Sequence, residues 1–296
     1  LMYQVKVHAP HNLGLTDPFL HLWYPGHNGA VQDFAVSGWD DYGPYFELTL
    51  RRNYFCFKYG DRGKEKRWEP LERCYGQHLG REVWTVAEHN EVYPVQPAPV
   101  AGTAADFARA ILPLRRKNHY LPETDVTGAG TISLLGANYL ADGTTVFGFF
   151  HPRAAQVYVV GNFNDWQSPY HRNPDPEKFI PMKLYLGYGG KPNIWLARTE
   201  LPDPADDRKN AYQFLVVGGV PLNDKQQPVK LAKDPYARRY APDYNYNNCQ
   251  LIDPSTYEWH DQAWRTPPID QLILYELNIY GFTDQDPTIP PELAGN

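Results

Sequence analysis

The chain has little of what marks a nucleic-acid or membrane protein. Its 28 Lys and Arg are outnumbered by 34 Asp and Glu, so the formal net charge is −6. With no basic run along one face, nucleic acid and anionic membranes are disfavoured as partners, and neutral ligands are favoured. No apolar stretch approaches the roughly 20 residues that cross a bilayer. The start, "LMYQVKVHAP", lacks the charged leader and apolar core of a signal peptide.

Cysteine is also scarce. The three cysteines, Cys56, Cys74 and Cys249, show no C-x-x-C spacing, so we expect no metal site, no redox pair and no cofactor. Cys56 and Cys74 lie in two segments that could form neighbouring strands and meet there. The odd number of cysteines in the chain leaves the cellular compartment open.

Aromatic residues and proline are plentiful instead, with 22 Tyr, 8 Trp and 28 Pro. This composition favours short strands joined by ordered loops and disfavours a helix-rich fold. A length of 296 residues suits two domains, since about 100–200 residues per domain is usual.

Two series of short strands follow this expectation. The first includes "QVKVHA", "FLHLWY", "YFELTL", "YFCFKY" and "EVWTVAE", and it predicts an antiparallel sandwich over residues 1–97. A Pro- and Ala-rich stretch, "PVQPAPVAGTAADF", predicts a linker over 98–129. The second series includes "TTVFGFF", "AQVYVVGNF", "NIWLARTEL" and "AYQFLVV". It predicts another sandwich over 130–242, followed by a connection over 243–296 with one buried strand, "LILYELNIYGF".

Three tryptophans stand out as candidate binding residues. In "FLHLWY" the alternation of a strand puts His21 and Trp23 on the face opposite the two leucines. There the rings could stack on a sugar, or Trp23 could pack under a loop. Trp68, in a charged loop, and Trp166, in the turn "GNFNDW", are likewise either presented to a ligand or packed as anchors.

The first segment resembles the starch-binding modules of carbohydrate-binding module family 41, through "VKVHAP", "LHLWYPG", "SGWDDYGPYFEL" and "REVWTVAEHNEVY". That family binds α-glucans with two tryptophans two residues apart, helped by a Lys and an Asp of a later loop. The resemblance places the ring pair on His21 and Trp23, and it implies Lys66 and Trp68 as the helpers.

The stretch "LGANYLADGTTVFGFFHPRAAQVYVVGNFNDWQ" resembles carbohydrate-binding module family 48, over residues 131–240, with "KDPYARRY" as its exit. These modules have an immunoglobulin-like fold and precede the barrel of glycoside hydrolase family 13 enzymes. In glycogen-binding relatives the Trp of the turn stacks on glucose, which implies that role for Trp166. A second Trp and a Lys complete the family site, but this chain has Gln213 near the Lys position and no such Trp.

"WRTPPIDQLILYELNIYGFT" resembles the first strand of the family 13 (β/α)8 barrel, with Asn278 in place of a His. Its carboxylate, Glu276, is expected to make a structural hydrogen bond, because glycoside hydrolysis needs a pair of carboxylates. A complete barrel takes about 250 residues, and 25 remain from Leu272 to Asn296. We therefore expect no catalytic residues in this chain.

The sequence thus predicts a mainly β chain: two immunoglobulin-like sandwiches and the first strand of a (β/α)8 barrel. The function this implies is α-glucan binding by the N-terminal portion of a family 13 enzyme, with a debranching, pullulanase-like activity in the parent. Its partners would be starch, glycogen or maltooligosaccharides and its own catalytic barrel. Alternatives are a branching or amylase-type parent, a free-standing glycogen- or starch-binding protein, and a protein-binding scaffold. The exposed apolar strand that a free-standing protein would carry argues against it.

Overall fold

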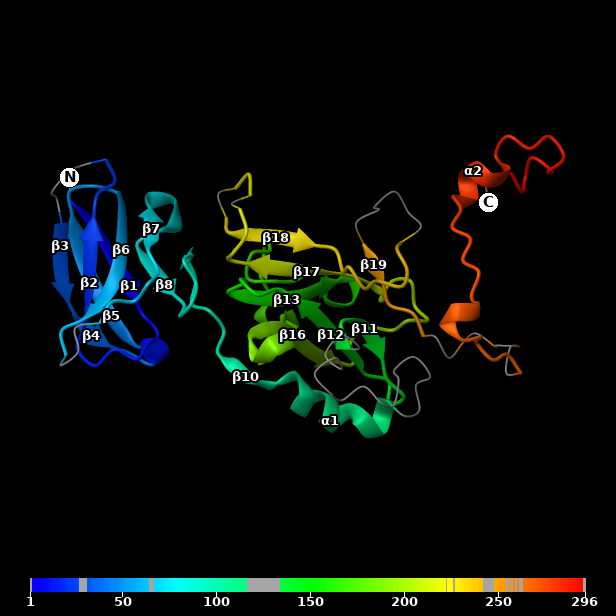
Figure 1. Ribbon diagram of the computed structural model, residues 1–296, viewed down its shortest axis with the longest axis horizontal. Helices are drawn as coiled ribbons and strands as arrows, with labels where there is room; N and C mark the ends of the chain where they lie inside the picture. Colours follow the sequence, from blue (N-terminus) through cyan, green and yellow to red (C-terminus); the bar gives the residue numbers. More distant parts are fainter. Residues whose placement is uncertain are drawn as a thin grey trace. The chain divides into compact units, whose positions relative to one another are not determined.

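The computed structural model describes residues 2–26, 31–63, 67–115, 134–221, 223–225, 227–241, 248–253, 256, 258, 260 and 263–294. The chain divides into two units, Leu1–Thr256 and Tyr257–Asn296. Four sheets, all in the first unit, make this a mainly β structure as the sequence predicts (Figure 1).

Two sheets form the first sandwich. One has the strand order β4-β5-β1-β8-β9 and the other β3-β2-β6-β7. All pairs are antiparallel except β1 with β8. The strands are β1 (Tyr3–His8), β2 (Pro18–Trp23), β3 (Val31–Ala35), β4 (Gly38–Trp39), β5 (Pro44–Leu50), β6 (Tyr54–Asp61), β7 (Arg73–Gly76), β8 (Glu82–Thr85) and β9 (Val92–Tyr93).

Alternation along these strands builds the core between the two sheets. In β5, Phe46, Leu48 and Leu50 are buried, whereas Tyr45 and Glu47 face outward. The buried residues of both sheets belong to one apolar cluster, so each sheet buries one face and keeps the other for solvent.

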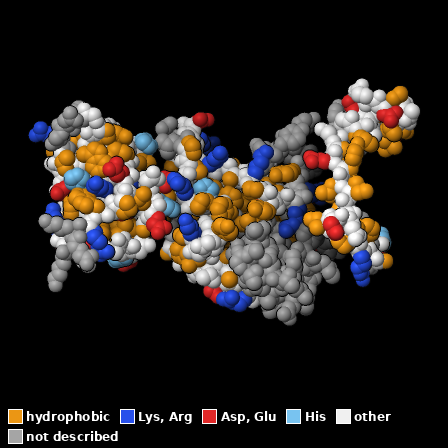
Figure 2. Space-filling model, viewed as in Figure 1, with side chains coloured by type: hydrophobic (Ala, Val, Ile, Leu, Met, Phe, Trp, Pro, Cys, Tyr) orange, Lys and Arg blue, Asp and Glu red, His pale blue; other side chains and the backbone are white. Residues whose placement is uncertain are grey.

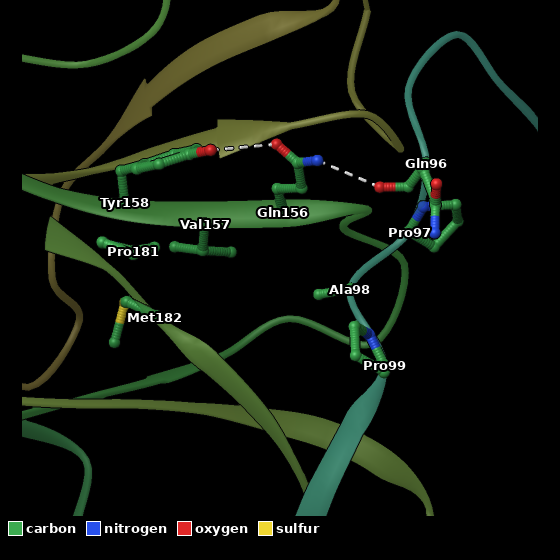
Figure 3. A pocket seen from close by; sticks show the side chains of 9 residues that line it. All are labelled: Gln96, Pro97, Ala98, Pro99, Gln156, Val157, Tyr158, Pro181 and Met182. Carbon is green, nitrogen blue, oxygen red and sulfur yellow. Dashed lines mark hydrogen bonds between the residues drawn. The ribbon is translucent and has the colours of Figure 1, made fainter. Parts of the chain in front are cut away.

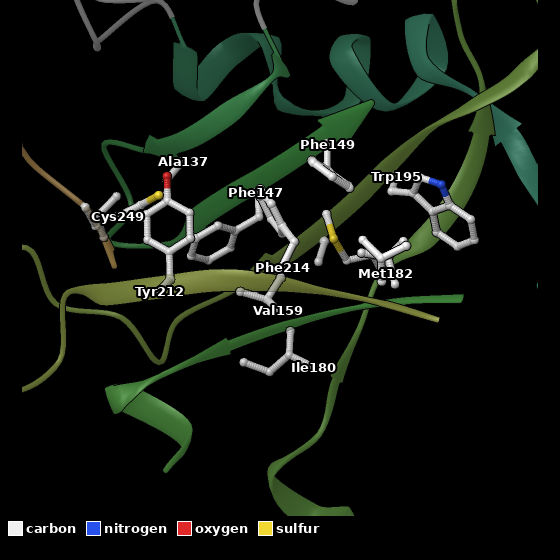
Figure 4. Close-up of a cluster of buried hydrophobic side chains, with 14 residues drawn as sticks. Ala137, Phe147, Phe149, Val159, Ile180, Met182, Trp195, Tyr212, Phe214 and Cys249 are labelled. Atoms are coloured by element: carbon white, nitrogen blue, oxygen red, sulfur yellow. The ribbon is translucent and has the colours of Figure 1, made fainter. Parts of the chain in front are cut away.

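The second sandwich is also built from two sheets, β10-β15-β16-β12-β11 and β14-β13-β17-β18, with β19 pairing β17. Its strands are β10 (Val100–Thr103), β11 (Gly136–Tyr139), β12 (Thr145–Phe150), β13 (Gln156–Gly161), β14 (Ile180–Pro181), β15 (Lys183–Leu186), β16 (Pro192–Thr199), β17 (Ala211–Val217), β18 (Val229–Ala232) and β19 (Cys249–Gln250). Figure 4 shows the core, in which Phe147, Trp195 and Phe214 are fully buried.

The segment expected to be a linker begins with ordered structure. β10 adds to the second sandwich by pairing in parallel with β15, and helix α1 (Ala104–Arg115) follows it. The Thr103 hydroxyl caps this helix by accepting the Asp106 N–H at 3.0 Å. Ala108 and Ile111 bury one face of the helix in a cluster with residues of the sandwich. Short 3-10 helices lie at His11–Leu13, Gln77–Leu79, Asn162–Asn164, Pro176–Lys178, Tyr188–Gly190 and Ile269–Gln271.

The C-terminal segment differs from the expectation. Residues 272–278 form no strand, and helix α2 (Ile279–Thr283) follows them. Ile273 and Leu274 are 96% and 87% exposed, and Glu276, expected to make a structural hydrogen bond, is also exposed. The prediction of a buried strand is therefore wrong for the chain as described, because a strand needs a neighbouring strand to satisfy its backbone and no described strand pairs with it.

Cys56 and Cys74 form a disulfide between the paired strands β6 and β7, which confirms that the two meet. Cys249 is buried and forms no disulfide. Among the described residues, no helix is both long and apolar enough to span a bilayer, and no group of three or more His, Cys, Asp or Glu has a metal-binding arrangement.

Replacing both disulfide cysteines by serine should lower the free energy of unfolding by about 3 kcal/mol, because the bond closes a short loop in the unfolded chain. Urea unfolding of the double variant measures this. Adding a thiol reductant to the unmodified chain should reproduce the loss and leave the double variant unchanged. Equal unfolding midpoints for the oxidised chain and the double variant would contradict the prediction.

Candidate binding site

Aromatic rings gather on the outer face of the sheet β3-β2-β6-β7. In the register of β2 and β6, His21 lies opposite Lys58 and Trp23 lies opposite Cys56. Residues directly opposite one another in an antiparallel pair point to the same face. Leu20 and Leu22 are fully buried on the other face, so burial of the leucines turns the two rings outward, as the alternation predicts.

Trp68 completes this ring cluster from a later loop. The ring centroids of His21 and Trp23 are 5.9 Å apart, and those of His21 and Trp68 are 5.2 Å apart with an edge-to-face orientation. The Lys58 ammonium lies 4.7 Å from the centroid of the Trp68 ring. Trp68 keeps 49% of its surface exposed, whereas His21 and Trp23 are half-buried. The cluster is therefore part anchor and part open aromatic surface.

Gly60 gives the Trp68 ring its place against the sheet. A Cβ on Gly60 would lie 2.4 Å from the ring of Phe19 and 3.1 Å from that of Trp68. The two rings themselves meet edge to face, with centroids 5.2 Å apart. Only a residue without a side chain lets both rings approach the strand this closely.

A buried ion pair fixes the chain immediately after Trp68. The Arg73 guanidinium, which has no exposed surface, donates to both carboxylate oxygens of Glu69 at 2.6 and 2.7 Å. It also donates to the Val86 carbonyl at 3.0 Å and lies over the ring of buried Tyr59. The Glu69 N–H donates to the Tyr59 carbonyl at 3.0 Å. The backbone beside Trp68 is thus held against β6.

On the other side of this loop, Asp61 organises the backbone. Its carboxylate accepts the N–H groups of Thr16, Gly63 and Asp17 at 2.9–3.0 Å. These hydrogen bonds, led by that of Thr16, lower the pKa of Asp61 from its ordinary value of 3.8 to about 2. The same carboxylate therefore ties the approach to β2 to the beginning of the Trp68 loop.

The polar groups of the site come partly from residues that the sequence did not single out. His21 Nδ1 lies 2.7 Å from a carboxylate oxygen of Asp33 on β3, and Lys58 stands opposite His21. Neither was predicted, because only the strand register identifies which residues face His21. Lys66, which was predicted, lies outside the described residues.

Trp166 belongs to a different surface, on the second sandwich. It follows Asp165 in a turn where both residues have positive φ, 54° and 58°, and its N–H donates to the Gly161 carbonyl at 2.8 Å. The ring is half-buried and packs against a cluster that includes Val160 and Leu215. Gln213, which stands near the position of the Lys in family 48 modules, is buried and donates to the Asn248 side chain at 3.1 Å. Trp166 therefore both packs and presents surface, in a cluster that also includes Tyr158 and Tyr170.

Replacing Glu69 by alanine should lower the free energy of unfolding by about 3–5 kcal/mol, because it leaves a buried guanidinium without its carboxylate. Glu72, exposed in the same loop, provides the matched control, and its alanine variant should unfold like the parent chain. Replacing Glu69 and Arg73 together by leucine and methionine should recover much of the loss. Similar urea midpoints for the Glu69 and Glu72 variants would refute this role.

The depressed pKa of Asp61 predicts a pH dependence of stability. A carboxyl group whose pKa falls on folding stabilises the native state above its unfolded pKa, and this contribution disappears as pH falls through the folded value. The stabilisation by Asp61 should therefore be complete above a pH of about 4 and lost towards pH 2. Urea unfolding at several pH values should show a shallower decline between pH 4 and 2 for Asp61→Asn. If stability falls with pH equally steeply in the parent chain and in Asp61→Asn, the predicted contribution of Asp61 is wrong.

Comparisons with known proteins identify the relatives of this chain. No protein-family model matches it. It is 30% identical over 198 residues to the 1,4-alpha-glucan branching enzyme GlgB 2 of Xanthomonas oryzae pv. oryzae, covering 66% of this chain and 22% of that enzyme. It is 29% identical over 140 residues to GlgB of Lactiplantibacillus plantarum, covering 47% and 18%. A glycogen debranching enzyme of Salmonella enteritidis is 31% identical over 87 residues, covering 23% and 13%.

Among solved structures, the G680L mutant of the Klebsiella pneumoniae protein PulA matches 100% of this chain and 37% of its own, with 15% identity and a TM-score of 0.32. The chain spans about a fifth of the length of the curated branching enzymes it matches. The chain is thus similar, over part of its length, to 1,4-alpha-glucan branching enzymes and to a glycogen debranching enzyme.

Proposed function

We propose that this chain is the α-glucan-binding N-terminal portion of a family 13 enzyme, with two binding-module-like sandwiches over residues 1–97 and 130–242. The observation that carries the proposal is the cluster of His21, Trp23 and Trp68 on one outer sheet face, with Lys58 over the most exposed ring. The branching and debranching enzymes among its relatives support the choice of ligand, because their names describe α-glucans as substrates.

The proposed site binds a glucan by stacking and by hydrogen bonds at the ring edges. Trp68 offers an open ring face to the apolar side of a glucose unit, and Trp23 extends this surface along β2. Asp33 occupies Nδ1 of His21, which leaves Nε2 to meet a sugar hydroxyl. The Lys58 ammonium donates to hydroxyl or ring oxygens from beside Trp68.

Binding, and not bond cleavage, is the role assigned to these residues. Hydrolysis of a glycosidic bond uses two carboxyl groups that flank it, about 5–10 Å apart. Of the described carboxylates beside the ring cluster, Asp33 is engaged with His21 and Glu69 with buried Arg73. For the parent enzyme we propose debranching of the pullulanase type, since the first sandwich resembles modules found at the front of pullulanases.

The exposed apolar run at residues 272–277 supports the second part of the proposal, that this chain is a portion of a larger enzyme. Ile273, Leu274 and Tyr275 are 96%, 87% and 76% exposed, and neighbouring apolar side chains are rarely left open to this extent unless another surface covers them. We assign that surface to the catalytic barrel of the same enzyme.

Alanine in place of Trp68 or Trp23 should weaken binding to amylopectin about tenfold each, because loss of a stacked ring costs about 1.4 kcal/mol. Retardation in gels containing amylopectin measures this. Trp39 provides the control: it is 57% exposed on a strand of the other sheet, and its alanine variant should be retarded like the parent chain. Absence of any retardation of the parent chain would rule out the proposed function, and an equal effect at Trp39 would rule out the assigned site.

A further inference from the structure

A pocket on the second sandwich takes no part in the site described above. It has a volume of about 360 Å³ and lies where the segment before β10 runs beside β13 and β14 (Figure 3). Its walls include Pro97 and Pro99 of that segment, Pro181 of β14, and Tyr158 of β13. This volume is at the small end of the range of about 300–1,000 Å³ for ligand pockets, which suits one or two sugar rings.

Hydrogen bonds hold the walls of this pocket in place. The Gln156 side-chain amide donates to the Gln96 carbonyl at 3.0 Å, and the Ala98 N–H donates to the Ala155 carbonyl at 2.8 Å. Ala98 also packs against the sandwich core. Since β14 has only two residues, the segment before β10 closes an edge of β13 that a longer strand would have covered. The pocket is thus built into the sandwich.

The chemistry of the walls selects a neutral ligand with both apolar faces and hydroxyl groups. None of the lining residues is charged, so a phosphorylated or carboxylated ligand would find no counter-charge. The prolines and the half-buried Tyr158 ring supply flat apolar surface. The Tyr158 hydroxyl donates to the Gln156 side-chain oxygen at 3.1 Å, which orients polar groups along one wall (Figure 3).

We propose that this pocket is a second α-glucan subsite, which binds a short neutral glucosyl segment between Tyr158 and the prolines, with Gln156 as its hydrogen-bonding residue. The identity of the sugar rests on the proposed function. Tyr158 also packs in the cluster that supports Trp166 and Tyr170, so a glucan that leaves the pocket over Tyr158 meets further aromatic surface. The subsite would let one chain engage a branched polymer through both sandwiches, which raises its overall affinity for polymer above that of either site.

The test uses the full chain, labelled with ¹⁵N, in which Trp23 and Trp68 are replaced by alanine to remove the first site. Titration with maltotriose should shift the backbone amide signals of Gln96, Ala98 and Gln156. Pro181→Arg, at an exposed position in the wall, should weaken this binding about tenfold or more by placing a bulky charge in the pocket. Gln156→Ala should also weaken it. Pro174→Arg, on an exposed loop outside the lining, should leave it unchanged.

The outcomes separate this proposal from the proposed function. If maltotriose shifts signals around Trp68 in the parent chain but none at Gln96, Ala98 and Gln156 in either chain, the subsite is wrong and the first site stands. If it shifts no signal in the parent chain, both proposals fall. Larger shifts at these three amides with glucose 6-phosphate than with maltotriose would overturn the assignment of a neutral ligand.

Discussion

The need of each sheet to bury one of its faces is the constraint on which this structure depends. In β2 the leucines enter the core and are fully buried, so the alternate residues His21 and Trp23 must face outward. Pairing with β6 then decides their neighbours, because it sets Lys58 opposite His21 and Cys56 opposite Trp23. The proposed binding surface is thus the outer side of the same strands that make the core.

The strands alone do not build the proposed site, because Trp68, its most exposed ring, lies on a loop. Trp68 stays in place because Glu69, next in the chain, pairs with buried Arg73, and because Gly60 leaves room for the ring. Burying an ion pair contributes little net stability, but the two hydrogen bonds between the Arg73 guanidinium and the Glu69 carboxylate fix its geometry. Rigid backbone under an open ring reduces the entropy lost when a ligand binds.

The proposed binding site shows which features could be predicted from the sequence. Alternation identified His21 and Trp23 as outward residues from local pattern alone, and composition indicated a β fold. The contributions of Lys58 and Asp33 could not be predicted, because they depend on strands that come together only in the folded sheet. The barrel-like segment shows the opposite limit. Its sequence has the pattern of a buried strand, but residues 272–278 are exposed and unpaired in the described chain, because strand formation requires a neighbour.

The sequence by itself determined the class of fold, the order of the two strand-rich regions and the outward position of the first ring pair, since side-chain alternation and turn residues act over a few neighbouring positions. The tertiary structure decided the rest. It brought Trp68 onto β2 and joined Cys56 to Cys74. It also laid the supposed linker along the second sandwich and so formed a pocket there. Each of these depends on contacts between residues distant in the chain, whose pairing is fixed by register and packing and not by local pattern.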